Sequence, residues 1–511
     1  MSKNQNDINQ ADRLSRITLF TVSLPFCALI AAIGIFWPDV FANAVSAYTN
    51  TVFRSLDWFY MLSVTGFLLV CLWLALGKYG KVKLGKPDDE PEFTTGSWLA
   101  MLFAAGMGVG LLFWGVAEPM IHFSAPPVGE AHTPQAAHQA MVITLLHWGL
   151  HAWGIYCIGA LVLAYFHYRR GLPYLAGSPI RGAFQGKWVE PVARIADLIA
   201  VLAVTFGVAG SLAMGVLQVQ TGLHVAAGVP VTTSAAMVIL ILLFFSYMTS
   251  AATSLDKGIK ILSNVNMATA IALMVFILFA GPTAFLLRGL VNTLGDYLAS
   301  LFVFSFRLYP YENLADWMGS WTLTYFVWWI AWTPFVGIFV ARISRGRTIR
   351  EFVVGVILAP SLFSVIWFSV FGGTGIYEET HGGGGIARIV HEDVTTALFS
   401  LFDRLPLSEI LTALALVLVY IFVVTSVDSA TYVLGMLTSQ GSMDPPTGRK
   451  LAWGIILAAL GGVLVLSGNI NVVRAGAISF ALPLTLILLI QAGALIRALG
   501  EEQPADPSAG T

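Results

Sequence analysis

The sequence predicts an all-α integral membrane protein of about twelve transmembrane helices. Of its 511 residues, 57% are hydrophobic and only 11% are charged, whereas about a quarter of the residues of a soluble domain are charged. Long apolar runs recur along the whole chain, and about 20 apolar residues are enough for a helix to cross a bilayer. Because of these apolar runs, we expect the chain to be surrounded by membrane lipid. A net charge of −1 at pH 7 argues against a nucleic-acid partner.

Apolar runs mark the individual spans. We expect spans at 18–36, 59–76, 98–116, 138–165, 195–217, 235–249, 265–287, 323–340, 352–371, 411–434, 452–466 and 475–495. The stretch 290–318 is aromatic and only partly apolar, which predicts an amphipathic helix along the outer interface.

Lysine and arginine gather in every other connection between these spans. The clusters are Arg13 and Arg16; Lys78, Lys81, Lys83 and Lys86; Arg169 and Arg170; Lys257 and Lys260; Arg342, Arg345, Arg347 and Arg350; Arg449 and Lys450; and Arg497. Positive connections face the cytoplasm in most membrane proteins. The alternation therefore predicts an even number of spans, with both termini cytoplasmic.

Large rings lie deep inside two of the spans, away from the interfaces where tryptophan is usual. The span 323–340 holds Trp328, Trp329 and Trp332. In the span 138–165, Trp148, Trp153 and Tyr156 would share an arc of roughly 140° on a regular helix. Ring faces attract a cation that cannot donate hydrogen bonds, by about 2 kcal/mol per desolvated contact. The two clusters predict a box for a quaternary ammonium or sulfonium group; ordinary helix packing is the alternative.

Glycine is concentrated in the span 98–116, at Gly106, Gly108, Gly110 and Gly115. Such a helix either unwinds, exposing backbone groups to a ligand as in broken transporter helices, or packs closely against a neighbour. A second break is expected at Thr333–Pro334, five spans later, where a second repeat of five helices would place it.

A group of oxygen ligands is expected in the span 411–434. The Phe422 carbonyl and the hydroxyls of Thr425 and Ser426, at i, i+3 and i+4, share one helix face. Oxygen ligands without thiolate or imidazole suit a hard monovalent cation. A buried carboxylate is often functional, but Asp428 points away from the Thr425 face by spacing, so a structural role is preferred for it.

These motifs give the chain, from the first span to the twelfth, a resemblance to the betaine/choline/carnitine transporter family. The matching motifs are GMGVG at 106–110, HWGLHAWGIY at 147–156, DKGIKILSNVN at 256–266, WWIAWTPFVGIFVARISRGRTIREF from Trp328, and TSVDS from Thr425. The resemblance implies a LeuT-like fold with two inverted five-helix repeats, a homotrimer in the bacterial cytoplasmic (inner) membrane, and sodium symport of a small cationic or zwitterionic osmolyte, glycine betaine or a close analogue. The implied divisions are 1–17 (tail), 18–92 (two peripheral helices), 93–289 (first repeat), 290–318 (interfacial helix), 319–498 (second repeat) and 499–511 (tail).

The resemblance also assigns residues. It implies a substrate site of Trp148, Trp153, Tyr156 and Trp329, with Trp328 and Trp332 as an inner gate and with Gly106, Gly108 and Ser211 toward the carboxylate. It implies a sodium site from the carbonyls of Ala104, Met107 and Phe422 and the hydroxyls of Thr425 and Ser426. No cofactor is expected besides this coupling ion.

The fifth span departs from the pattern of the family's betaine symporters. Their second sodium site uses two threonines, where this chain has Val204 and Val208. Either one sodium suffices or a proton takes the second role. Proton-coupled choline uptake and import of a sulfonium osmolyte such as dimethylsulfoniopropionate remain alternatives, and a channel is the alternative of a different class. The sequence shows neither the charge rings nor the repeated filter carbonyls of a channel, and no catalytic triad that would indicate an enzyme. The short acidic tail at 500–511 does not favour osmotic regulation.

Overall fold

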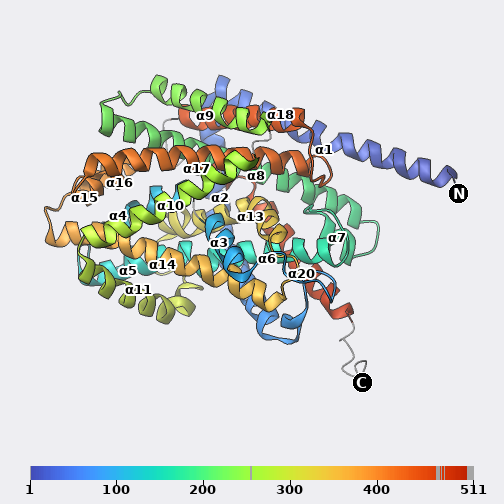
Figure 1. Cartoon of the computed structure of the whole chain (residues 1–511), viewed down its shortest axis with the longest axis horizontal. Helices are drawn as coiled ribbons and strands as arrows, with labels where there is room; N and C mark the ends of the chain where they lie inside the picture. The colour runs from blue at the N-terminus through green and yellow to red at the C-terminus, as the bar shows by residue number, and fades with distance from the viewer. Residues whose placement is uncertain are drawn as a thin grey trace.

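The computed structural model describes residues 2–106, 108–253, 256–467 and 478–502, together with 472, 475 and 476. The regular secondary structure in these ranges is helical, apart from an isolated bridge between Lys83 and Thr348. Most helices run side by side along the long axis of the molecule (Figure 1). This arrangement confirms the predicted all-α membrane fold.

The helices have the following bounds. They are α1 (Ser2–Phe36), α2 (Pro38–Leu76), η1 (Lys78–Lys81), α3 (Thr95–Gly106), α4 (Val109–Ser124), α5 (Pro134–Trp148), α6 (Leu150–Tyr168), α7 (Ser178–Ala183), α8 (Val189–Ala227), α9 (Thr233–Thr253), α10 (Asp256–Ala280), α11 (Thr283–Phe304), α12 (Ala315–Met318), η2 (Gly319–Leu323), α13 (Thr324–Arg342), α14 (Ile349–His381), α15 (Ile386–Glu392), η3 (Val394–Thr396), α16 (Ala397–Phe402), α17 (Ser408–Leu437), α18 (Thr447–Leu466) and α20 (Ala481–Glu501).

Eleven helical stretches of the described chain are long and apolar enough to cross a membrane. The expected span at 98–116 is not one of them, because it forms two shorter helices: α3 has 12 residues and α4 has 16. Taken together, α3 and α4 would provide the remaining crossing of the expected twelve. The chain is therefore a multi-pass membrane protein.

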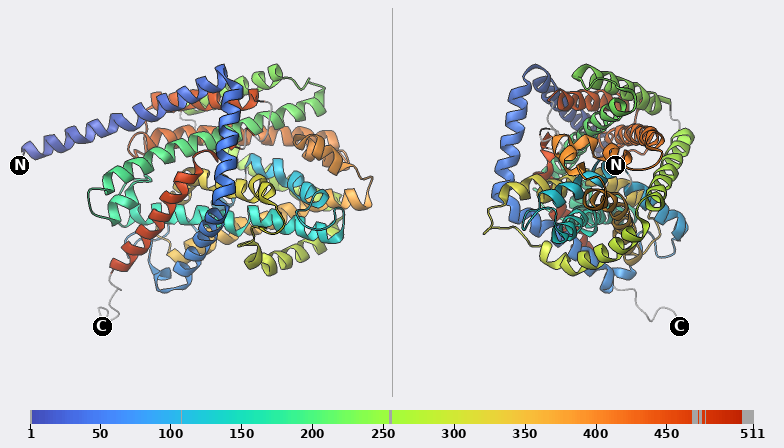
Figure 2. Two further views of the ribbon diagram at one scale, coloured as in Figure 1. Left: turned by 180° about the vertical axis from the view of Figure 1, so that it is seen from behind. Right: turned by 90° about the vertical axis from the view of Figure 1, so that its left-hand side faces the viewer.

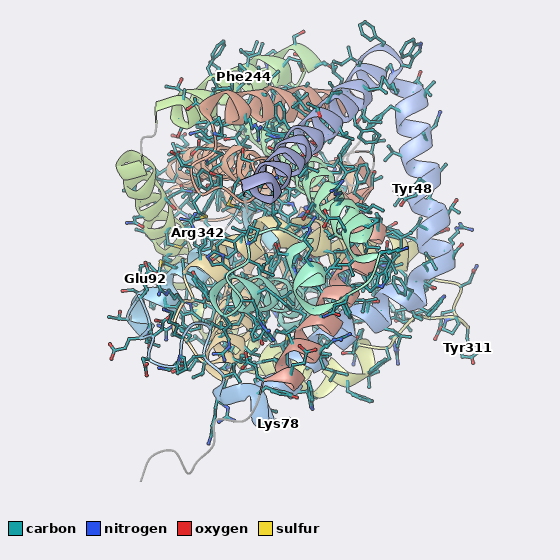
Figure 3. All side chains as sticks on the ribbon, turned by 90° about the vertical axis from the view of Figure 1, so that its right-hand side faces the viewer. Tyr48, Lys78, Glu92, Phe244, Tyr311 and Arg342 are labelled. Carbon is teal, nitrogen blue, oxygen red and sulfur yellow. The ribbon has the colours of Figure 1, made fainter. Side chains whose placement is uncertain are left out.

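The helices divide into a central bundle and peripheral elements. Helix α2 crosses the back of the bundle at a steep angle to the others (Figure 2), and Tyr48 marks its position at the edge of the molecule (Figure 3). Helices α15 and α16 lie at one end of the long axis, and α7 lies at the other (Figure 1). The start of α1 and the end of α20 both lie toward the α7 end (Figures 1 and 2).

Helices α6 and α13 make the most extensive contact between any two described helices. Their backbones approach closely because glycines face each other's chain. A Cβ added at Gly159 would overlap Cγ2 of Thr333, and one at Gly337 would lie 3.3 Å from the backbone nitrogen of Ala160. Small residues bring membrane helices together in this way, and here they join the two helices that carry most of the predicted box.

Three interruptions differ from or refine the sequence-based expectation. The glycine-rich span is broken before Gly108, which caps α4 with extended backbone angles. The fourth span, expected to be one helix, is interrupted at Gly149, so Trp148 ends α5 and Trp153 lies on α6. The expected break at Thr333–Pro334 is wrong, because α13 continues through Pro334. Proline removes one amide donor only, and membrane helices accommodate it by local adjustments.

Helix α13 instead begins after a turn of π-helix, η2. Such wide turns occur frequently at functional sites. Within α13, the Thr333 hydroxyl donates to the carbonyl of Trp329 at 2.9 Å, which adds a second hydrogen bond in the turn beside the proline.

Candidate functional site: an aromatic cavity

A cavity of about 900 Å³ lies between α4, α6, α8, α13 and α17. It is lined by the predicted substrate residues that the structure describes, which come from α5, α6, α8 and α13 and from the N-cap of α4. These are Gly108, Trp148, Trp153, Tyr156, Ser211, Trp328, Trp329 and Trp332. Met107 lies outside the described residues, as do the side chains at Ala104 and Gly106, so the predicted roles of these three residues remain expectations.

The four predicted box rings form a connected set of edge-to-face contacts. The ring centres of Trp148 and Trp329 are 5.0 Å apart, with an interplanar angle of 74°. Those of Tyr156 and Trp329 are 5.8 Å apart, and those of Trp153 and Tyr156 are 5.4 Å apart. Sequence spacing therefore identified rings that converge, although the helix break at Gly149 places Trp148 on a different segment from the other two.

The cavity is also lined by aromatic residues that were not predicted from the sequence. Trp114 and Tyr325 lie near the predicted box, and the others are Phe335, Phe339 and Tyr432. The Tyr325 ring centre is 5.5 Å from that of Trp148 and 6.3 Å from that of Trp329. Tyr325 precedes Trp329 by four residues, so helical spacing would have placed both rings on one face.

Two glycines make room for the rings of the site. A Cβ added at Gly110 would lie 3.0 Å from Cη2 of Trp148, and one at Gly207 would lie 3.1 Å from both Cδ1 and Nε1 of Trp332. The glycine-rich segment thus combines the two alternatives weighed for it: the helix is interrupted before Gly108, and Gly110 permits close packing.

The predicted oxygen ligands of α17 line the same cavity. Phe422, Thr425 and Ser426 all contribute to its wall. The Thr425 Oγ1 atom lies 3.2 Å from the carbonyl oxygen of Phe422 and donates to the carbonyl of Ile421 at 2.9 Å. Two oxygens of the kind a hard cation prefers are thus adjacent. Asp428, for which a structural role was preferred, also lines the cavity.

The two valines of the fifth span are buried in α8, with Val204 at 0% and Val208 at 1% exposure. Val208 contributes to the cavity wall. Their side chains carry no oxygen that could bind sodium. The intervening Thr205 hydroxyl donates to the carbonyl of Val201 at 2.7 Å, within its own helix.

The residues that line the two ends of the cavity differ in their exposure to solvent. Toward the connection between α17 and α18, its wall includes the exposed residues Arg342, Met443 and Asp444. Toward the opposite end, the wall includes Trp114 and Tyr325, which are buried. The site is thus accessible from the end that carries the Arg449 and Lys450 cluster.

Known proteins resemble this chain over nearly its whole length. The family model described as "BCCT, betaine/carnitine/choline family transporter" matches residues 18–504. The glycine betaine transporter OpuD of Bacillus subtilis is 41% identical over 488 residues, covering 95% of each chain. The ectoine/hydroxyectoine transporter of Virgibacillus pantothenticus is 40% identical and covers 94% of this chain and 96% of its own. The high-affinity choline transport protein of Escherichia coli is 34% identical, over 96% of this chain and 73% of its own.

Proposed function

Because this chain belongs to the betaine/carnitine/choline transporter family, and is therefore a transporter and not an enzyme, we propose that it imports glycine betaine or a close analogue by sodium symport. The observation that carries the proposal is the convergence of Trp148, Trp153, Tyr156 and Trp329 on a cavity that also contains Thr425 and Ser426.

The chemistry of the rings supports a methylated onium substrate. A trimethylammonium group has no N–H to donate, so hydroxyls and carboxylates bind it poorly. Indole and phenol faces attract its charge and also pack against its methyl groups, with about 2 kcal/mol per desolvated contact. Four rings in mutual contact can therefore offset much of the hydration that the cation loses on entering the cavity.

Sodium is the coupling ion in this proposal. The Phe422 carbonyl and the Thr425 and Ser426 hydroxyls are candidate ligands, and hard oxygen donors of this kind favour alkali and alkaline-earth cations. Their position in the substrate cavity supports linkage between the two binding events. With valines at 204 and 208, we propose one sodium site and not two.

A second candidate is proton-coupled uptake of choline. Val204 and Val208 favour it, because no second sodium site of the usual kind is possible there, and one relative carries the name of a choline transport protein. An ectoine-like solute or a sulfonium osmolyte such as dimethylsulfoniopropionate would meet the same rings.

We further propose that the protein lies in the inner membrane of a bacterial cell, with both termini in the cytoplasm. In this structure the cavity would open toward the cytoplasm. The positive connection at Arg449 and Lys450 supports this orientation. A cavity that reaches exposed residues at one end and buried rings at the other favours alternating access over a channel. A homotrimer is the expected assembly, which native mass spectrometry of the detergent-solubilised protein would test.

Uptake by the purified protein in liposomes tests the proposal. Radiolabelled betaine should accumulate with an inward sodium gradient and not without one, and equal uptake in both cases would reject sodium coupling. Choline driven by a proton gradient is the corresponding assay for the second candidate.

A variant pair sharpens the sodium assay. Thr425→Val should raise the sodium concentration for half-maximal uptake by about tenfold, as expected for the loss of one polar ligand. Thr412→Val is the matched control, because Thr412 is buried in the same helix but does not line the cavity.

A further inference from the structure

A fully buried carboxylate lies next to the aromatic cavity, hydrogen-bonded to one of the lining rings but not lining the cavity itself. Glu118 of α4 is 0% exposed, and its Oε1 lies 2.5 Å from Nδ1 of His147 on α5. The same oxygen is 3.6 Å from Nε2 of His122, one helical turn further along α4. An unpaired charge is costly in such surroundings, so the hydrogen bonds to its two oxygens are needed to hold this carboxylate there.

The carboxylate and its histidine partner reach the two tryptophans at the centre of the box. The second oxygen, Oε2, accepts the indole N–H of Trp148 at 2.7 Å. The indole N–H of Trp329 donates to the main-chain carbonyl of His147 at 2.7 Å. One group of atoms thus orients two rings that belong to α5 and α13.

The helix break at Gly149 explains why the His147 carbonyl can accept this bond. Helix α5 ends at Trp148, and the last four carbonyls of a helix have no partner within it. The carbonyl of His147 is one of these, and it accepts a hydrogen bond from the Trp329 indole. In an uninterrupted helix, the same carbonyl would accept a hydrogen bond from the backbone N–H four residues later.

The polar side-chain atoms of Glu118 and His147 all have partners. Glu118 uses both oxygens, and His147 uses both ring nitrogens, because its Nε2 lies 2.9 Å from Oγ1 of Thr322. The His147 ring also stacks on that of Tyr325, with centres 4.8 Å apart. Hydrogen bonds to a charged group are shorter and about twice as strong as neutral ones, so this arrangement has few other geometries open to it.

We propose that Glu118 and His147 are positioning residues of the substrate site. Glu118 holds the Trp148 ring through its indole N–H, and the imidazole that it pairs with fixes the carbonyl to which Trp329 is bound. The spacing of the two rings, and hence affinity for the onium group, depends on a carboxylate that does not line the cavity. This inference rests on the proposed function and deepens it.

A double-mutant cycle in the full-length protein tests the inference. Binding of radiolabelled betaine is measured for the wild type, Glu118→Gln, Trp148→Phe and the double variant. Each single change should weaken binding by about tenfold, because Glu118→Gln replaces the charge-assisted hydrogen bond to Trp148 by a weaker neutral one and Trp148→Phe removes the donor. The double variant should bind betaine better than the product of the two single effects would give, because both changes act on the one bond between Glu118 and Trp148.

The control is Trp367→Phe. Trp367 is also fully buried, and its indole donates to the carbonyl of Leu111 on α4 at 3.0 Å, but it does not line the cavity. Its loss should leave betaine affinity unchanged while lowering the melting temperature. A fall in affinity equal to that of Trp148→Phe would show that any lost indole bond has this effect, and would overturn the inference.

Additive effects in the cycle, or an unchanged affinity of Glu118→Gln, would also overturn it. If Glu118→Gln does not fold, Thr322→Val tests the His147 side, since it removes only the outer hydrogen bond of the imidazole. Affinity should then fall by a few-fold, and an unchanged value would contradict the inference. Absence of betaine binding by the wild type would instead contradict the proposed function and would be recognised before any variant is compared.

Discussion

At the scale of single residues, the site depends on where each large ring can rest and on what holds it there. Trp148 and Trp329 are oriented by their indole N–H bonds to Glu118 and to the His147 carbonyl, while their ring centres stay 5.0 Å apart. A ring so restrained loses little freedom when a ligand binds, and such preorganisation favours affinity.

Replacing one of these rings should remove a definite part of the binding energy. Trp329→Leu is expected to weaken betaine binding by about 2 kcal/mol, because one cation–ring contact is lost in a desolvated site. Isothermal titration calorimetry on the purified protein measures the change.

Trp58→Leu serves as its control, because Trp58 is 52% exposed on the peripheral helix α2. This variant should bind betaine as the wild type does. Equal losses in both variants would mean that the rings act through stability alone.

Spacing within a helix predicted most of the ring residues, because aromatic side chains three or four positions apart share a face. Glu118 was not predicted. The span was expected to end at residue 116, whereas α4 continues to Ser124, so the carboxylate fell outside the apparent membrane segment. Its partner His147 lies 29 positions away in sequence, and no local pattern joins the two.

At the scale of helices, two glycine-dependent features shape the site. The break at Gly149 ends α5, and a Cβ there would lie 2.7 Å from the hydroxyl of Tyr297, which itself accepts the backbone N–H of Leu150 at 2.9 Å. The break is thus fixed by a residue of α11, far away in the sequence. A uniform apolar run gave no sign of it.

Helix α4 contributes through the small size of Gly110. Gly110→Ala should press a methyl group against Trp148 and weaken betaine binding by a few-fold, because the ring must shift from its place in the box. The melting temperature should stay close to that of the wild type, because a shift of the Trp148 ring toward the cavity relieves the close contact.

Gly96→Ala on the neighbouring α3 provides the comparison, since nothing lies within 4 Å of a Cβ at that position. If both alanine variants bound betaine like the wild type, the contact between α4 and Trp148 would not contribute to the site.

At the scale of the whole molecule, hydropathy and charge predicted the membrane fold well. Each span is a local property of about 20 residues, so the run of helices follows from the sequence directly. The Thr333–Pro334 break was wrong because proline alone does not determine whether a membrane helix unwinds; the contacts of α13 with α6 maintain it. How the ends of the cavity differ could not be predicted, because it depends on how helices tilt against one another.

Accessibility of engineered cysteines tests the proposed orientation. Met443 is 43% exposed and lines the cavity, and Tyr311 is 96% exposed on the connection after α11, where it projects from the edge of the molecule (Figure 3). The native Cys27, Cys71 and Cys157 are buried and should react little.

A membrane-impermeant maleimide should therefore label Met443→Cys only in inside-out vesicles and Tyr311→Cys only in right-side-out vesicles. Labelling of both variants from the same side would refute the orientation, and betaine should slow the reaction at Met443→Cys by stabilising the occupied state.

The central claim is that ring faces bind the positive charge of a methylated onium group, and a carbon isostere isolates that charge. In 3,3-dimethylbutanoate a neutral carbon replaces the nitrogen of betaine, so shape and carboxylate are kept while the cation is lost. Calorimetric titration of the purified protein, in saturating sodium, compares the two Kd values. We expect the isostere to bind at least about tenfold more weakly; equal affinities would contradict the account.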